Sequence, residues 1–228
     1  MIPGRPFRST PGYFAAGVQD AYNRRAEKSI SSIDSPHSVV ASYTYELPFG
    51  TGKRFANGKD VFSKYVIGGW SISGIHTYRA GTPIAVGTNL RLITTGDSLS
   101  QTQPTLRPNL VSGGSPRTGL SCGGFDPATS LYLNLAAFTD PAPFSFGNAP
   151  RRLPNVRGCT YSDENISLLK YFPVVHERVS MRLGADFFNI FNRRHLGGPA
   201  TNIDNANFGR ISGAGPPRIM QLNFKILW

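Results

Sequence analysis

The chain has 228 residues, a net charge of +11 and only 16% charged residues, and it contains 25 glycines and 18 prolines. This composition favours many short strands and turns, and no stretch approaches the roughly 18 consecutive apolar residues of a membrane-spanning helix. The 24 lysines and arginines are scattered through turn-like segments without a basic stripe, which argues against a nucleic-acid partner.

Residues 1–36 have the composition of a loop. They are rich in proline, glycine and serine, and they lack the apolar run of a signal peptide. A protein that must be exported needs such a signal. If the chain belongs in an outer membrane, we therefore expect it to be a piece of a longer protein. Residues 1–36 would then be a loop at the truncated N-terminal end of this piece.

Two strands are predicted next, at about 38–48 and 66–81, because apolar and polar residues alternate in both. A period of two residues gives a strand one apolar face and one polar face. The apolar positions are Val39, Ala41, Tyr43, Tyr45 and Leu47 in the first strand and Trp70, Ile72 and Tyr78 in the second.

Residues 89–163 show no sustained period and are dominated by Ser, Thr, Gly, Pro and Asn. A loop of this length counts against a compact soluble domain, whereas outer-membrane barrels have short periplasmic turns and long external loops. We therefore expect a long external loop. Cys122 and Cys159 lie in it without metal-ligand spacing, and the sequence leaves open whether they form a disulfide.

Three more strands are predicted at about 164–172, 178–191 and 217–228. In the last of them, Met220, Leu222, Phe224, Ile226 and Trp228 share one face, and polar residues fill the other. An alternating strand that ends on an aromatic residue is typical of the terminal strand of an outer-membrane barrel.

The predicted fold is all-β: an antiparallel, up-and-down transmembrane β-barrel segment that supplies the C-terminal strands of a large outer-membrane barrel. Residues 37–228 form this segment, and the cell outer membrane is the expected location. The alternative is a soluble or surface-attached β-sandwich that binds carbohydrate or acts as an adhesin, because half-buried antiparallel strands alternate in the same way.

Two sets of residues are candidates for function on the barrel hypothesis. Polar residues on the inner face would line the lumen, mostly as wall residues without a ligand role: Glu46, Arg79, Arg182, Asp186 and Lys225. Aromatic residues near strand ends would lie at the membrane interface: Tyr45, Trp70, Phe172 and Trp228. We find no pattern for catalysis, a metal or a cofactor, so an enzyme is not expected.

Several segments resemble a known family over most of the chain. They are SPH at 35–37, YELPFG at 45–50, GGWSISGI at 68–75, GTP at 81–83, RPN at 107–109, FFNIFN at 187–192 and NFGRI at 207–211. In this order they resemble the C-terminal barrel of Oar-like TonB-dependent receptors, outer-membrane transporters with a carboxypeptidase-regulatory-like domain.

The resemblance implies a barrel of roughly 22 strands, of which this chain forms the last part. Such receptors take up a scarce ligand with energy transmitted through TonB. The implied partners are outer-membrane lipid and lipopolysaccharide, the remainder of the barrel and its plug, TonB through that plug, and the barrel-assembly machinery at the C-terminal strand.

Overall fold

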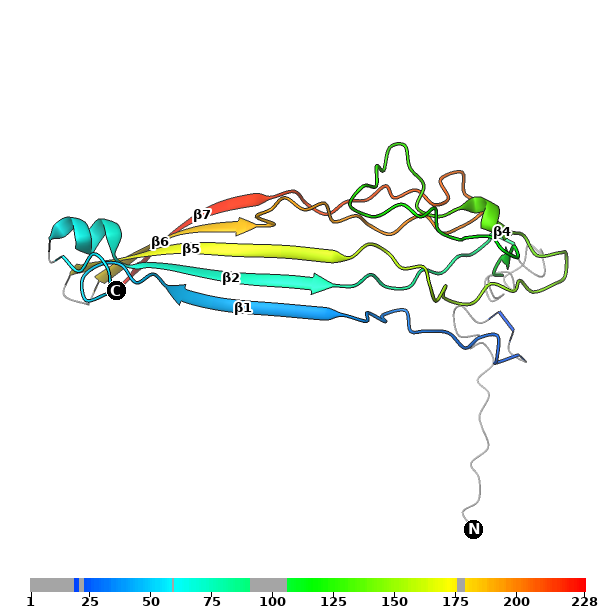
Figure 1. Cartoon of the computed structure of the whole chain (residues 1–228), viewed down its shortest axis with the longest axis horizontal. Coiled ribbons are helices and arrows are strands. Elements are labelled where there is room, and N and C mark those ends of the chain that lie inside the picture. The colour runs from blue at the N-terminus through cyan, green and yellow to red at the C-terminus, as the bar shows by residue number, and fades with distance from the viewer. Residues whose placement is uncertain (1–18, 21–22, 59, 91–105, 176–178) are drawn as a thin grey trace, which may run out of the picture. The chain divides into compact units, whose positions relative to one another are not determined.

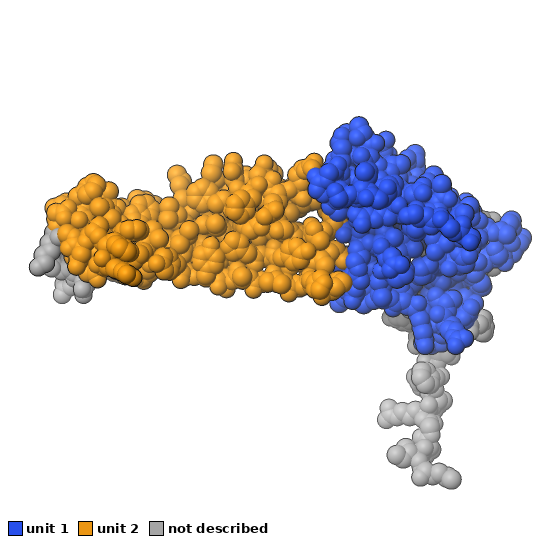
Figure 2. All heavy atoms as spheres, viewed as in Figure 1, with its two compact units in different colours: residues 1–34, 82–158, 198–212 blue, residues 35–81, 159–197, 213–228 orange. Residues whose placement is uncertain are grey.

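The structure, a computed structural model, describes residues 19–20, 23–58, 60–90, 106–175 and 179–228 (Figure 1). Most of the predicted loop at 1–36 and part of the predicted loop at 89–163 thus lie outside the described residues. The chain divides into two compact units, shown in different colours in Figure 2. Unit 1 comprises Met1–Asp34, Thr82–Gly158 and Gly198–Ser212, and unit 2 comprises Ser35–Gly81, Cys159–Gly197 and Gly213–Trp228.

Unit 2 contains one antiparallel sheet of five strands in the order β1-β2-β5-β6-β7 (Figure 1). The strands are β1 (Ser38–Glu46), β2 (Trp70–Arg79), β5 (Tyr161–Val175), β6 (Val179–Phe188) and β7 (Ile219–Leu227). The five strands are neighbours in the sheet in the same order in which they follow one another in the chain, since β3 and β4 belong to a separate ladder. The sheet is therefore an up-and-down meander, as predicted. The sheet is not closed, because β1 and β7 each have a strand partner on one side alone among the described residues.

The connection from β1 to β2 holds structure that alternation alone does not predict. The strand predicted from residue 66 begins only at Trp70, because a π-helical turn, η1 (Ser63–Ile67), comes first. Gly69 has a φ of +75°, and a Cβ added there would lie 2.5 Å from the carbonyl oxygen of Tyr171. Glycine at this position permits both the turn and the close approach of β5.

The other strand ends also differ from the predicted ranges for local reasons. β5 extends beyond 164–172 at both ends, since its ladder with β2 continues to the pair Arg79 and Tyr161 and its ladder with β6 continues to the pair Val175 and Val179. β6 ends at Phe188 instead of 191, because Asn189 has a φ of +51°, which turns the chain out of the sheet. β1 and β7 end within two residues of the predicted ranges.

Unit 1 has a core of its own, although its largest segment was predicted as a loop. It contains the two-stranded ladder of β3 (Asn109–Leu110) and β4 (Phe138–Thr139) and the short 3-10 helix η3 (Leu135–Ala137). Two aromatic pairs meet edge to face: Phe125 with Tyr132 at 5.9 Å and Phe138 with Phe208 at 5.7 Å between ring centroids. Other buried members are Leu106, Leu133, Leu153, Val156 and Ile211.

Both cysteines of the chain, Cys122 and Cys159, are disulfide-bonded. This answers the question that the sequence left open. A disulfide is compatible with the oxidising side of a cell envelope.

The apolar face of the sheet is not covered by a second layer of the described chain. Leu183 is 44% exposed, Phe224 53% and Leu222 85%. These values do not fit a sandwich, in which this face packs against another sheet. In the described part of the chain, no helix has the length and apolar character needed to cross a membrane.

Candidate functional site

The strand register places all five polar candidates on one face of the sheet. Directly paired residues share a face, and side chains alternate along each strand. Glu46 pairs with Ser71, and the same row continues through Leu169 and Gly184 to Asn223. Arg79, Arg182, Asp186 and Lys225 each lie an even number of residues from a member of this row. We call this side of the sheet the polar face.

The polar face is hollowed in two places. A hollow of 510 Å³ crosses the middle of the sheet, and a second of 410 Å³ lies toward the end that carries η1. The polar-face residues that line the first are mostly polar, with Ile75 and Phe188 as apolar exceptions: Ser42, Thr44, Ser73, Asn165, Ser167 and Asp186. The second includes Glu46, Lys53, Ser71, Tyr171 and Arg182. Hydroxyls, amides and charges on a hollowed face suit contact with water or a polar ligand.

Asp186 is hydrogen-bonded by residues of the two adjacent strands. Ser167 Oγ donates to Asp186 Oδ1 at 2.5 Å, and Asn223 Nδ2 donates to Oδ2 at 2.7 Å. The side chain of Asn223 also lies over Gly184, where an added Cβ would be 2.3 Å from it. Because both carboxylate oxygens have a partner on an adjacent strand, the network ties β5, β6 and β7 together.

The remaining polar candidates are more accessible. Glu46 forms an exposed 2.8 Å ion pair with Lys53, and solvent weakens a contact of this kind. Arg182 and Lys225 are directly paired across β6 and β7 and both are exposed. The described residues give neither of these two an acidic partner, so the pair presents concentrated positive charge on the polar face.

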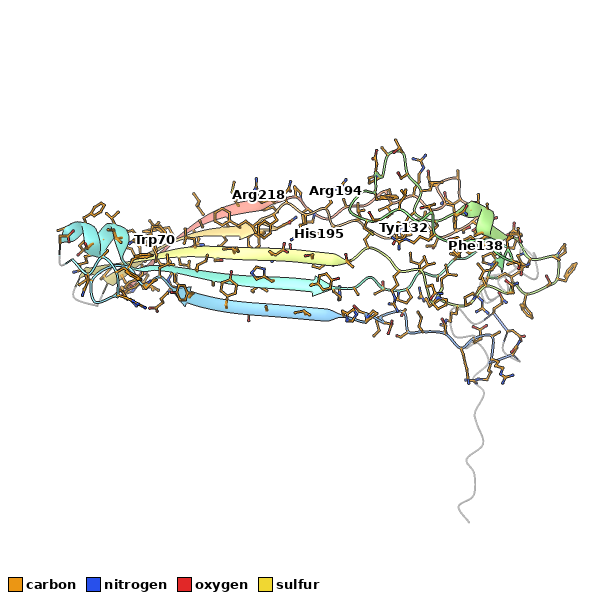
Figure 3. The ribbon with its side chains drawn as sticks, viewed as in Figure 1. Trp70, Tyr132, Phe138, Arg194, His195 and Arg218 are labelled. Atoms are coloured by element: carbon orange, nitrogen blue, oxygen red, sulfur yellow. The ribbon has the colours of Figure 1, made fainter. Side chains whose placement is uncertain are left out.

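The four aromatic candidates lie at one end of the sheet and on its other face. Tyr45 is near the end of β1, Trp70 begins β2 (Figure 3), Phe172 is near the end of β5, and Trp228 follows β7. Tyr45 is 54% exposed and Trp228 93%. Tyr43 and Tyr78 occupy the same face farther toward the opposite end. These two tyrosines were not among the interface residues predicted from the sequence. Aromatic residues toward both ends of an apolar face are typical of the two girdles of an outer-membrane barrel.

Alternation also places two charged residues on the apolar face, and these were not singled out from the sequence. Lys170 pairs with Trp70, and Glu164 pairs with His76. Both charged residues are buried, Lys170 at 3% and Glu164 at 8% exposed. Glu164 receives two bonds from Arg193 Nε, at 2.8 and 2.9 Å. Both residues lie an even number of positions from Ile166 and Leu168, so the sequence alone could have placed them on the apolar face.

Comparison with known proteins bears directly on this two-faced sheet. A family model described as "Outer membrane beta barrel domain" matches residues 4–221, almost the whole chain. The chain belongs to this family. No curated protein and no solved structure matches the chain.

Family membership assigns the barrel domain to the outer membrane. The apolar face is then the lipid face, and the hollowed polar face is the inner one. The β-sandwich alternative is excluded, since it requires a second layer on the face that the structure leaves open. Among the described residues, no group of three or more His, Cys, Asp or Glu side chains is placed to hold a metal ion.

Proposed function

We propose that the chain is the C-terminal barrel portion of an Oar-like TonB-dependent receptor, which takes up a scarce ligand across the outer membrane with TonB-transmitted energy. In this proposal the sheet is part of the barrel wall, its polar face lines the lumen, and unit 1 lies outside the cell. The ordered motifs, from YELPFG at 45–50 to NFGRI at 207–211, support the specific receptor type.

The observation that carries the proposal is an open sheet with a hollowed polar face. Backbone groups at a free strand edge are very costly in hydrocarbon, so β1 and β7 need further strands on their open sides. Five strands thus supply a fraction of a wall. Barrels of about 22 strands are transporters with a plugged lumen, which fits a wall whose inner side chains are polar.

The proposal includes several partners. The remainder of the barrel and the plug would contact the sheet edges and the polar face, and TonB would act through the plug. Outer-membrane lipid and lipopolysaccharide would surround the apolar face, and the barrel-assembly machinery would bind β7. No cofactor, metal, nucleic acid or catalytic step is part of this function.

Contact with a plug is tested by photo-crosslinking in the full-length protein in its own membrane. A photoreactive residue replaces Gln221 on the polar face or, as the matched control, Leu222 on the apolar face. We expect the first to link to a peptide of the plug and the second to give lipid adducts. Absence of a plug peptide at position 221, with the barrel folded, contradicts the proposal.

Dependence on TonB is tested genetically in the native host. Strains that lack this gene, TonB or both are compared for growth under a panel of limiting nutrients. If TonB supplies the energy, loss of the receptor gene causes no further defect in the strain without TonB. An additive defect under the nutrient that reveals the receptor phenotype contradicts TonB-dependent uptake.

A further inference from the structure

Unit 1 contains a small polar hollow of its own. Its volume is 280 Å³, and it is formed between the segment around residues 27–32 and the pair Arg151 and Arg152. The lining residues are Glu27, Ser29, Ile30, Ser31, Ser32, Arg151 and Arg152. The lining therefore combines three serines and two arginines with one glutamate and one isoleucine.

The segment that carries the serines is fixed to the core of unit 1 through Glu27. Glu27 Oε2 accepts a bond from Arg107 Nη1 at 2.9 Å, and Oε1 accepts from the backbone of Gln19 at 3.0 Å. The Gln19 side chain in turn bonds the Arg107 N–H at 2.6 Å and the Gly147 carbonyl oxygen at 2.9 Å. Ser29 Oγ donates to the Arg152 carbonyl oxygen at 3.4 Å. The walls of the hollow are therefore held together before any ligand arrives.

The charge in the hollow is positive. Glu27 is its one acidic lining residue, and the carboxylate is neutralised by Arg107, whose side chain is buried with it. For the Arg152 guanidinium, the described residues provide no hydrogen-bond or ion-pair partner. Arg24, Arg25 and Lys28 add positive charge on the same segment.

We propose that this hollow binds a tetrahedral oxyanion, namely the phosphate group of a phosphorylated ligand. Arginine presents several donors in a planar fork that matches phosphate oxygens, and the hydroxyls of Ser31 and Ser32 add short donors on the opposite wall. The phosphate has two possible sources: lipopolysaccharide at the outer surface or a soluble phosphorylated compound. The site itself does not depend on the transport proposal, but the lipopolysaccharide source does, since it requires unit 1 to lie outside the cell.

The site is tested by titrating the full-length protein in detergent with inorganic phosphate. Arg152→Gln removes the cationic wall, and the double change of Ser31→Ala and Ser32→Ala removes hydroxyls without a change in charge. Arg210→Gln is the matched control, because Arg210 is an exposed arginine of unit 1 that does not line the hollow. Resistance to limited proteolysis verifies that each variant keeps the fold of unit 1.

We expect Arg152→Gln to weaken phosphate binding about tenfold or more, as loss of a charge-assisted hydrogen bond does. The serine variant should weaken binding to a smaller degree, and Arg210→Gln should change it by less than about twofold. If the wild type does not bind phosphate, or if Arg152→Gln and Arg210→Gln weaken binding equally, the proposed site is wrong.

The two sources are separated by titration with lipopolysaccharide and with the same lipopolysaccharide after removal of its phosphates. Binding that requires the phosphates and is lost in Arg152→Gln supports the membrane source. Lipopolysaccharide binding that is unchanged by Arg152→Gln, together with lost binding of inorganic phosphate, supports a soluble phosphorylated ligand in the same hollow.

Discussion

Lys170 shows how a single charged residue is accommodated on the lipid face. Its Nζ donates to the carbonyl oxygens of Val66, at 3.1 Å, and Gly68, and it lies 5.1 Å from the ring centroids of both Trp70 and Phe172. A buried ammonium group without such partners is very unfavourable. Val66 in the π-helical turn η1 and Gly68 directly after it thus provide the carbonyls that Lys170 needs, and Lys170 ties this turn to the sheet.

Replacement of Lys170 tests this role. In Lys170→Met the Gly68 carbonyl loses its donor, so we expect the full-length protein to be destabilised by about 1–3 kcal/mol. The measurement is urea unfolding in lipid vesicles followed by tryptophan fluorescence. Lys225→Met on the polar face is the control and should change the free energy of unfolding by less than about 0.5 kcal/mol. Equal stability of the two variants would show that Lys170 has no anchoring role.

Glu27 makes unit 1 sensitive to acid. Burial raises the pKa of this carboxyl, but the hydrogen bonds from Arg107, Gln19 and Asp20 outweigh burial and hold the pKa below its ordinary value of 4.5. A group with a lowered pKa in the folded state adds stability above pH 4.5, and this stability is lost as the pH falls toward the folded-state pKa. Below pH 4.5, unit 1 should therefore open more readily.

Limited proteolysis across this pH range, with an acid-active protease, measures the effect. At neutral pH, Glu27→Gln should be cut faster than the wild type, because it leaves the buried Arg107 without its carboxylate. As the pH falls below 4.5, the wild type should approach the variant. A constant ratio of the two cleavage rates over the whole range would contradict the assigned role of Glu27.

At the scale of elements, the sequence predicted the strands well because a lipid face imposes a strict period. In β7 and β6, apolar side chains occupy every second position, so both the strands and their faces can be read directly. Strand ends are set by other factors, such as the left-handed backbone of Asn189 and the turn before Gly69. The same period of two residues explains why the five polar candidates share a face. The hydrogen-bond partners of Asp186 could not be predicted in this way, because they depend on the register between strands, which the sequence of one strand does not specify.

The difference between the two faces predicts that an arginine on β7 destabilises the protein on one face and is tolerated on the other. Leu222→Arg places a cation on the lipid face, at a cost of about 2–4 kcal/mol near the middle of the bilayer. Gln221→Arg places it on the polar face and should be nearly neutral. Urea unfolding of the full-length protein in vesicles compares the two variants, and assembly yield in cells provides a second measure. Similar losses in both variants would contradict the assignment of faces.

At the scale of the whole chain, the two units differ in how well their structure can be predicted from the sequence. The core of unit 1 is built from isolated apolar residues far apart in the chain, such as Phe125, Phe138 and Phe208. No local period marks such a core, which is why residues 89–163 were predicted as a loop. Unit 2 is the reverse case: its strands are evident locally, but the described residues leave its apolar face uncovered and both edges of its sheet without a strand partner.

The open edges and the uncovered face predict how the 228 residues behave when they are produced alone. Among the described residues, the outer edges of β1 and β7 have no strand partner for their backbone N–H and C=O groups, and a large apolar face lies beside them. Such edges drive pairing between copies, so we expect aggregates or mixed oligomers in detergent, without a cooperative unfolding transition. Light scattering after size exclusion, combined with urea unfolding, measures both properties, and the full-length protein is the control. A monodisperse monomer that unfolds cooperatively in plain buffer would mean that this sheet needs neither lipid nor neighbouring strands, and the barrel-wall assignment would be wrong.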